Sequence, residues 1–140
     1  MCEIIKEIEV DAEDARLEDV IAFLEENLEN VDCPPRVQTQ LCVAAEEIFV
    51  NIAHYAYGTG KGKAAVRIAI SGEPVTVILT FMDNGMPFDP LAKEDPDITL
   101  PAEEREIGGL GIFMTKKIMD DVSYEYRDGK NILRMKKQLG

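Results

Sequence analysis

The amino-acid sequence predicts an α+β fold, a two-layer sandwich in which a mostly antiparallel or mixed sheet of about five strands carries three helices on one face. Two observations predict this fold. Alternating apolar residues mark strands, and apolar residues at helical spacing mark helices. The resulting order is strand, helix, helix, strand, strand, long loop, helix, strand, strand, without an internal repeat. We therefore expect a single domain over residues 1–140.

The first part of the chain predicts one strand and two helices. Residues 2–10 alternate between apolar and charged side chains, as in a half-buried strand, and Asp11 is positioned to cap the helix that follows. Apolar residues at helical spacing continue that helix to about Glu29. The pair Pro34-Pro35 then marks the start of a second helix, which runs to about Tyr57.

The second part of the chain predicts two antiparallel hairpins separated by a loop and a helix. The loop, residues 83–111, is rich in glycine, proline and charge and has no regular periodicity. A loop of more than about 20 residues in a compact domain is either functional or disordered. The expected elements are strands at Ala65–Ser71 and Val75–Met82, a helix at about Ile112–Asp120, and strands at about Val122–Tyr126 and Ile132–Lys137 that are joined by a turn at Asp128-Gly129.

The charge balance argues against several classes of partner. Fifteen Lys and Arg residues against twenty-seven Asp and Glu residues give a net charge of −12. Because phosphate contacts need a local excess of cations, we do not expect direct binding to nucleic acid or to an anionic membrane. No apolar run approaches the roughly 18–20 residues of a membrane span, and the acidic N-terminus is no signal peptide.

Cysteine and histidine content narrows the chemistry. The three cysteines are odd in number and form no CxxC pair, which is typical of reduced thiols in a cytoplasm. The single histidine, His54, argues against most zinc sites and histidine-based catalytic triads. Any chemistry must therefore use carboxylates, amides, backbone groups and a borrowed cation.

A carboxylate and an amide stand one turn apart on the second helix. Glu47 and Asn51 lie on one shoulder of its apolar stripe, whereas Glu46 falls on the opposite flank. Such a pair can hold a hard cation and supply a proton-accepting base. The same pair also fits an ordinary surface glutamate beside an asparagine at the edge of a cleft.

Two glycine-containing segments follow. The strand that ends at Asp83 is followed by Gly85, so the carboxylate could accept a hydrogen bond from an exocyclic amine such as that of adenine. The alternative is a simple Asn-Gly turn. Gly108-Gly109-Leu110-Gly111 leads into a helix and could present free N–H groups to phosphate, or could act as a hinge. Its pattern is neither a P-loop nor a Rossmann fingerprint.

Taken together and in this order, these motifs resemble the ATP-binding domain shared by histidine kinases, type II topoisomerases and Hsp90 chaperones. More narrowly, the chain resembles the small bacterial anti-sigma factors that are also serine-protein kinases. The segment 47–51 matches the family's N-box, 83–89 its first glycine box and 108–111 its second. The resemblance covers nearly the whole chain and implies an ATP lid over about residues 86–110.

The resemblance implies a role for each matching residue, with ATP and Mg²⁺ as cofactors. Asn51 would bind the Mg²⁺ that bridges the phosphates, and Glu47 would act as general base toward the attacking hydroxyl. Asp83 would receive the adenine amino group, and Gly85 would allow the nucleotide to approach. The lid residues that would contact or fold over the phosphates are Arg105, Gly108, Gly109, Leu110 and Gly111.

The chain departs from the family pattern at two places. The family's His-x-Tyr after the N-box is replaced by Tyr55-Ala56-Tyr57, with His54 one place early, so we interpret His54 as a bystander. The family's Gly-Thr before the last strand is replaced by Gly129-Lys130. Lys130 could supply a charge to a phosphate, or the threonine contact is lost.

The function that the resemblance implies is an ATP-dependent anti-sigma factor. It would bind a sigma factor and phosphorylate a serine of a STAS-type antagonist in a bacterial cytoplasm. Arg16, on the expected first helix, lies where the family has a partner-contacting arginine. The alternative is a non-catalytic ATP-binding module that sequesters a protein partner. The family is also homodimeric, and Val43, Phe49 and Val50 lie away from the main stripe of the second helix, which indicates burial on a second side.

Overall fold

The computed structural model of the chain describes residues 3–57, 60–87 and 109–139. Each predicted helix and strand has a counterpart in these ranges. The elements are β1 (Ile4–Asp11), the short 3₁₀ helix η1 (Asp14–Arg16), α1 (Leu17–Glu29), α2 (Pro35–Tyr55), β2 (Lys63–Ser71), β3 (Thr76–Asp83), α3 (Gly109–Ile118), β4 (Asp121–Arg127) and β5 (Lys130–Gln138).

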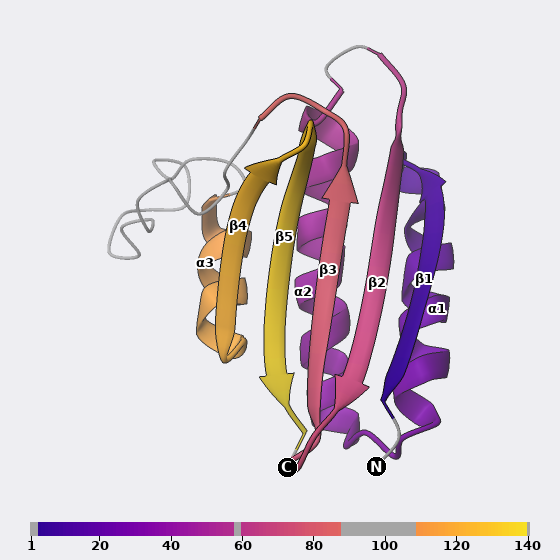
Figure 1. Cartoon of the computed structure of the whole chain (residues 1–140), viewed down its shortest axis with the longest axis vertical. Helices are drawn as coiled ribbons and strands as arrows, with labels where there is room; N and C mark the ends of the chain where they lie inside the picture. Colours follow the sequence, from indigo (N-terminus) through magenta and orange to yellow (C-terminus); the bar gives the residue numbers. More distant parts are fainter. Residues whose placement is uncertain (1–2, 58–59, 88–108, 140) are drawn as a thin grey trace.

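The strands form one sheet in the order β1-β2-β3-β5-β4, and every neighbouring pair is antiparallel. The three described α-helices lie on the same side of this sheet, with α1 behind the β1 edge, α2 behind the centre and α3 near the β4 edge (Figure 1). The predicted α+β fold is therefore confirmed. None of the described helices is long and apolar enough to cross a bilayer.

The period-two pattern of the strands turns one face of the sheet toward the helices. In β2, Val66 and Ile68 are fully buried, whereas Lys63 and Arg67 are exposed on the other face. Burying an aliphatic side chain of this kind contributes roughly 1.5–3 kcal/mol. The helix α2 supplies the largest share of the facing layer, through Leu41, Ala44, Ala45, Ile48 and Phe49. Because these residues fix how α2 is rotated against the sheet, they also fix where its polar shoulder lies.

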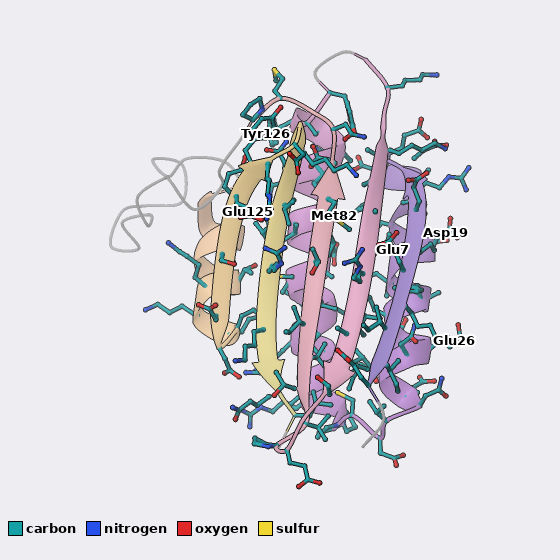
Figure 2. All side chains as sticks on the ribbon, viewed as in Figure 1. Glu7, Asp19, Glu26, Met82, Glu125 and Tyr126 are labelled. Carbon is teal, nitrogen blue, oxygen red and sulfur yellow. The ribbon has the colours of Figure 1, made fainter. Side chains whose placement is uncertain are left out.

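The opposite face of the sheet is covered by none of the described helices. Glu7, Met82 and Glu125 lie on this open face (Figure 2). Charged side chains on it pair across the strands, with 3.0 Å between Arg67 Nη2 and Glu7 Oε1 and 3.4 Å between Arg134 Nη1 and Glu125 Oε1. Exposed pairs of this kind add little stability, so their main effect is to keep the open face polar.

The expectation that Asp11 caps the first helix is wrong. Asp11 ends β1 and stands directly opposite Lys63 in the β1–β2 register, with 2.6 Å between its Oδ1 and Lys63 Nζ. The hydrogen bond and the charge of Lys63 lower the pKa of the Asp11 carboxyl. The residue that precedes α1 is instead Arg16, which makes no side-chain capping bond. The Asp11 carboxylate therefore pairs with Lys63 on the neighbouring strand instead of capping the helix that follows it in the sequence.

Two helix boundaries differ from their predicted positions. The helix α2 ends at Tyr55 rather than at about Tyr57. The helix α3 begins at Gly109 rather than at about Ile112, so Gly109 and Gly111 belong to its first turn instead of to a loop before it. The first N–H groups of a helix have no partner within the helix, so this turn still presents free donors.

The final hairpin turns where the sequence predicts. Asp128 and Gly129 have φ angles of 54° and 78°, and two successive positive φ values define the type I′ turn that suits a two-residue hairpin loop. The turn leads directly into β5, whose register with β3 sets Asn131 opposite Asp83. The hairpin thus delivers a polar side chain to the end of the central strand.

The two described cysteines, Cys33 and Cys42, are free thiols. Burial, with the nearby charge of Glu25, raises the pKa of the Cys42 thiol to about 11. Since the thiolate is the nucleophilic form of cysteine, this thiol is a poor nucleophile at neutral pH.

The prediction that α2 is buried on a second side is confirmed for Phe49. Its side chain is fully buried within the monomer, in the cluster between α2 and the sheet, because α2 packs on more of its circumference than one narrow stripe. Val43, by contrast, is 52% exposed. Of these two residues, only Val43 therefore remains available to a partner.

We predict that Phe49→Ala lowers the free energy of unfolding by about 3–5 kcal/mol, because it leaves a cavity in the core. Val43→Ala on the same helix changes that free energy by less than about 0.5 kcal/mol. Urea denaturation followed by circular dichroism measures both. A loss for Phe49→Ala that vanished at low protein concentration would contradict burial within the monomer.

Candidate functional site

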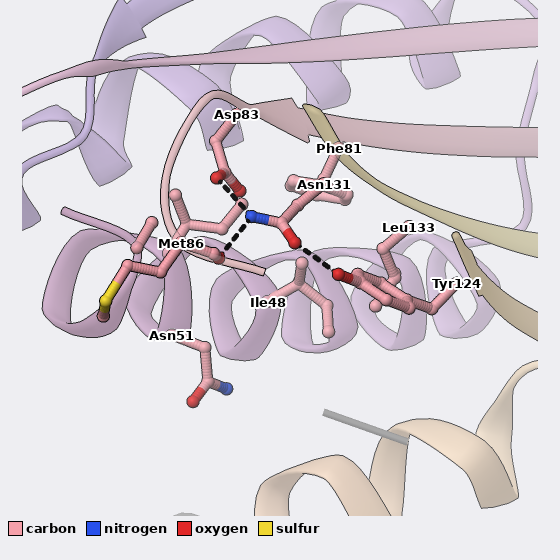
Figure 3. A pocket seen from close by; sticks show the side chains of 10 residues that line it. Ile48, Asn51, Phe81, Asp83, Met86, Tyr124, Asn131 and Leu133 are labelled. Carbon is pink, nitrogen blue, oxygen red and sulfur yellow. Dashed lines mark hydrogen bonds between the residues drawn. The ribbon is translucent and has the colours of Figure 1, made fainter. Parts of the chain in front are cut away.

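A pocket lies between the sheet and the C-terminal half of α2 (Figure 3). Its volume is about 420 Å³ when the open mouth is included, which is within the range of small-molecule sites. The lining is mostly apolar, with polar groups at a few points, as is typical of small-molecule sites. It is formed by Ile48, Asn51, Ile52, Ala56, Phe81, Asp83, Met86, Tyr124, Asn131 and Leu133.

Asp83 places a carboxylate at the sheet side of this pocket, and only 6% of the residue is exposed. Its Oδ1 accepts a hydrogen bond from the N–H of Gly85 at 2.8 Å and another from Nδ2 of Asn131 at 2.9 Å. Oδ2 accepts no hydrogen bond from any residue that the structure describes. One oxygen of the carboxylate thus remains able to accept a hydrogen bond from a ligand.

Gly85 has a packing reason to be glycine. A Cβ on this residue would lie 2.1 Å from the carbonyl oxygen of Ala56, which follows the C-terminal end of α2. The same carbonyl accepts the N–H of Met86 at 2.8 Å. The absence of a side chain therefore lets the turn after β3 press against the end of α2. The family resemblance implies that this glycine allows a nucleotide to approach, and the structure gives a packing reason for it.

Tyr57 also holds the turn after β3 in place, through its hydroxyl group. Its hydroxyl accepts the N–H of Asn84 at 2.9 Å and donates to the carbonyl of Lys63. Burial raises the pKa of this phenol, which keeps it protonated as a donor at neutral pH. His54 lies outside the pocket, and its Nε2 is 2.8 Å from Oδ2 of Asp14.

Glu47 and Asn51 are paired on α2 as their spacing predicts. Nδ2 of Asn51 donates to the carbonyl of Glu47 at 2.8 Å and to its Oε1 at 3.1 Å. Asn51 lines the pocket together with Asp83, but Glu47 does not. The resemblance gives all three residues a role around one nucleotide, but only two of them line this pocket, and Glu47 is joined to it through its hydrogen bond to Asn51.

The oxygen of Asn51 is the candidate metal ligand. Both contacts that engage its nitrogen come from Glu47, which leaves the amide oxygen as the group that can face a cation. Among the described residues, no three His, Cys, Asp or Glu side chains gather around a point that could hold a metal ion. A cation at Asn51 therefore needs most of its ligands from elsewhere, such as the phosphates of a nucleotide.

The sequence analysis missed two polar residues of the pocket, Asn131 and Tyr124. Asn131 is 7% exposed, and its Nδ2 donates to Asp83 and, at 2.7 Å, to the carbonyl of Met86. Its Oδ1 accepts the hydroxyl of Tyr124. The sequence did contain an indication of this role. Asn131 stands two residues before the buried Leu133, at an inward-facing position of β5. A polar side chain at such a position needs a buried hydrogen-bond partner.

The remaining predicted residues divide into three groups. Arg105 and Gly108 lie outside the described residues, while Gly109, Leu110 and Gly111 open α3. Arg16 is in η1 rather than in α1, with Nη1 3.4 Å from Oδ2 of Asp19 and about half of its side chain exposed.

Lys130 is on the wrong face for the role considered for it. It lies beside Met82 and Glu7 in a shallow hollow on the open face of the sheet, because its neighbour Asn131 takes the inward position. The idea that Lys130 gives a charge to a phosphate in the pocket is therefore not supported.

Comparison with known proteins agrees with this architecture. Residues 10–137 match the family model of the histidine kinase-like ATPase domain. The chain belongs to this family. A structure of the RsbU and RsbW domains of Rv1364c from Mycobacterium tuberculosis superposes with a TM-score of 0.67 over 97% of the chain and 32% of that protein. At 16% identity, this similarity shows the fold alone.

Several curated proteins resemble the chain in sequence. Serine/threonine-protein kinase BtrW of Bordetella bronchiseptica is 29% identical over 100 residues, which are 71% of the chain and 70% of BtrW. Serine-protein kinase RsbW of Listeria monocytogenes is 31% identical over 101 residues, 69% of the chain and 63% of RsbW. RsbW of Bacillus cereus is 29% identical over 98 residues, 67% of the chain and 60% of that protein. The chain thus spans less than two thirds of both RsbW relatives.

We predict that Gly85→Ala destabilises the protein by about 3 kcal/mol or more, because the new Cβ meets backbone atoms that cannot rotate away. Gly129→Ala is the matched control. A Cβ there meets nothing within 4 Å, so only the positive φ opposes it, at a cost of about 1 kcal/mol. Thermal denaturation compares the two variants, and equal losses would contradict the close approach of the turn to α2.

Proposed function

We propose that the chain is an ATP-dependent protein-serine kinase that binds a sigma factor and phosphorylates a serine of a STAS-type antagonist. The observation that carries this proposal is the joint position of Asp83 and Asn51 on one apolar pocket, with Glu47 bonded to Asn51. The names of the relatives, BtrW and RsbW, support serine kinase chemistry.

The nucleotide binds with its base in the apolar part of the pocket. The adenine amino group donates a hydrogen bond to Oδ2 of Asp83, the carboxylate oxygen with no described partner. The phosphates extend toward Asn51 and toward the first turn of α3, which contains Gly109 and Gly111, because the N-terminal N–H groups of a helix favour an anion. Residues 86–110 act as the ATP lid, with Arg105 and Gly108 as phosphate contacts.

The residues at Asn51 fit a magnesium ion bound together with the phosphates. The amide nitrogen is engaged by Glu47, so the oxygen, a hard ligand, is the atom presented to the cation. Mg²⁺ supplies neutralisation of the charge that develops on the transferred phosphoryl group. Because the chain has a net charge of −12, the cation also offsets the repulsion between the protein and the negatively charged phosphates.

Glu47 is the proposed general base. It is half-buried at the rim, where the serine of a protein substrate can reach it, and its bond to Asn51 fixes the position of the carboxylate. The serine hydroxyl gives its proton to Glu47 while its oxygen forms the new bond to the γ-phosphorus. The bond from that phosphorus to the bridging oxygen breaks, and ADP leaves.

The partner contacts rest on exposed groups. Arg16, which is only weakly held by Asp19, is the proposed contact for the partner protein. We place this activity in the bacterial cytoplasm, without direct contact with nucleic acid. A non-catalytic module that holds ATP and sequesters its partner remains the second candidate, and the position of Glu47 outside the pocket lining favours it.

We predict that Glu47→Gln binds Mg-ATP with an affinity within about threefold of the wild type but loses phosphotransfer by about 10²–10⁴-fold. Glutamine keeps an oxygen for the Asn51 amide but cannot take the serine proton. Calorimetry measures binding, and transfer of labelled phosphate to a STAS protein measures catalysis.

Asn51→Ala is the matched comparison on the same helix turn. It removes the proposed metal ligand, so Mg-ATP affinity falls by about tenfold or more. Unchanged phosphotransfer in Glu47→Gln would refute the base assignment. Absence of any transfer by the wild type, with ATP bound, would favour the non-catalytic module.

We also propose a homodimer. Its support is the family resemblance, the exposed Val43 on α2 and the open face of the sheet. Light scattering at micromolar concentration is expected to give twice the chain mass of 15.6 kDa. A concentration-independent mass of 15.6 kDa would contradict the dimer.

A further inference from the structure

A buried cross-strand pair controls which oxygen of Asp83 is available to a ligand. Asn131 stands directly opposite Asp83 in the β3–β5 register, and both residues are less than a tenth exposed. The Asn131 amide donates to Oδ1 of Asp83 over 2.9 Å (Figure 3). A polar pair in an apolar pocket is maintained because neither group has water as an alternative partner.

The orientation of the Asn131 amide is fixed by its surroundings. Its NH₂ group faces two acceptors, Asp83 Oδ1 and the carbonyl of Met86 at 2.7 Å, and its oxygen receives the hydroxyl of Tyr124. A flipped amide would set its oxygen against the carboxylate and the carbonyl, and would turn its NH₂ group toward Tyr124. The network therefore holds both amide protons away from an incoming base.

The same network fills both hydrogen-bond acceptor positions of one carboxylate oxygen, Oδ1 of Asp83. Oδ1 of Asp83 has two lone-pair directions, and the N–H of Gly85 and Nδ2 of Asn131 use both. A ligand can then form a hydrogen bond with Oδ2 alone. Adenine presents one exocyclic amine and matches a single acceptor. Guanine presents N1–H and the 2-amino group side by side, and that pair engages a carboxylate in a bidentate manner only if both oxygens are available.

We propose that Asn131 is a specificity-determining residue, which makes the pocket select adenine over guanine nucleotides by occupying Oδ1 of Asp83. The inference rests on the proposed binding of ATP at Asp83. Asn131 acts through Asp83 rather than on the base itself. Tyr124 supports it by holding the amide in the donating orientation.

The test compares two nearly isosteric variants of the full chain. Asn131→Val removes the donor to Asp83, whereas Asn131→Thr keeps a hydroxyl that can donate to it across the strands. Calorimetry with ATP and with GTP, each with Mg²⁺, gives the ratio of the two affinities. In Asn131→Val we expect the preference for ATP to fall by about tenfold, as the loss of one hydrogen-bond constraint predicts. In Asn131→Thr we expect it to stay within about threefold of the wild type.

The ratio of the ATP and GTP affinities separates an effect on specificity from an effect on stability, because a less stable fold would weaken the binding of both nucleotides together. Tyr124→Phe is a second variant that keeps Asn131 in place, and it is expected to lower the preference in the same direction by a smaller factor. An unchanged ratio in Asn131→Val and Tyr124→Phe, with ATP still bound, would overturn this inference alone. Failure of the wild type to bind either nucleotide would overturn the proposed function together with it.

Discussion

The contact between the turn after β3 and the end of α2 determines the geometry of the whole pocket. Gly85 presses against the carbonyl of Ala56, and that carbonyl holds the N–H of Met86. The sheet contributes Asp83 and the helix contributes Asn51, so the distance between the two polar ends of the pocket depends on this single junction. Apolar packing fixes the rotation of α2, and the junction fixes its end.

Sequence reasoning was accurate where the controlling interactions are local. The i, i+4 spacing on α2 predicted that Glu47 and Asn51 lie side by side, because helix geometry alone brings them together, and the structure adds a hydrogen bond between them. Strand alternation and turn chemistry predicted the antiparallel sheet and the hairpin at Asp128 and Gly129 for the same reason.

The errors arose where distant segments meet. Asp11 forms an ion pair with Lys63, which lies 52 positions later in the chain (63 minus 11). No local sequence pattern could therefore show that Asp11 does not cap the first helix. Asn131 reaches Asp83 only through the pairing of β5 with β3, and its partner is therefore invisible until the strand order is known. That the core of the monomer itself covers Phe49 also depends on what packs against α2, which the local sequence does not show.

The hydroxyl of Tyr57 links the pocket to the β1 edge of the sheet, at the same end of the strands. It joins the backbone of Asn84 to that of Lys63, and the neighbouring Gly62 accepts the N–H of Ala12, two residues before η1 begins. These bonds are in series along one route. The turn that follows Asp83 therefore cannot shift far without moving the segment that leads to Arg16, unless one of these hydrogen bonds breaks.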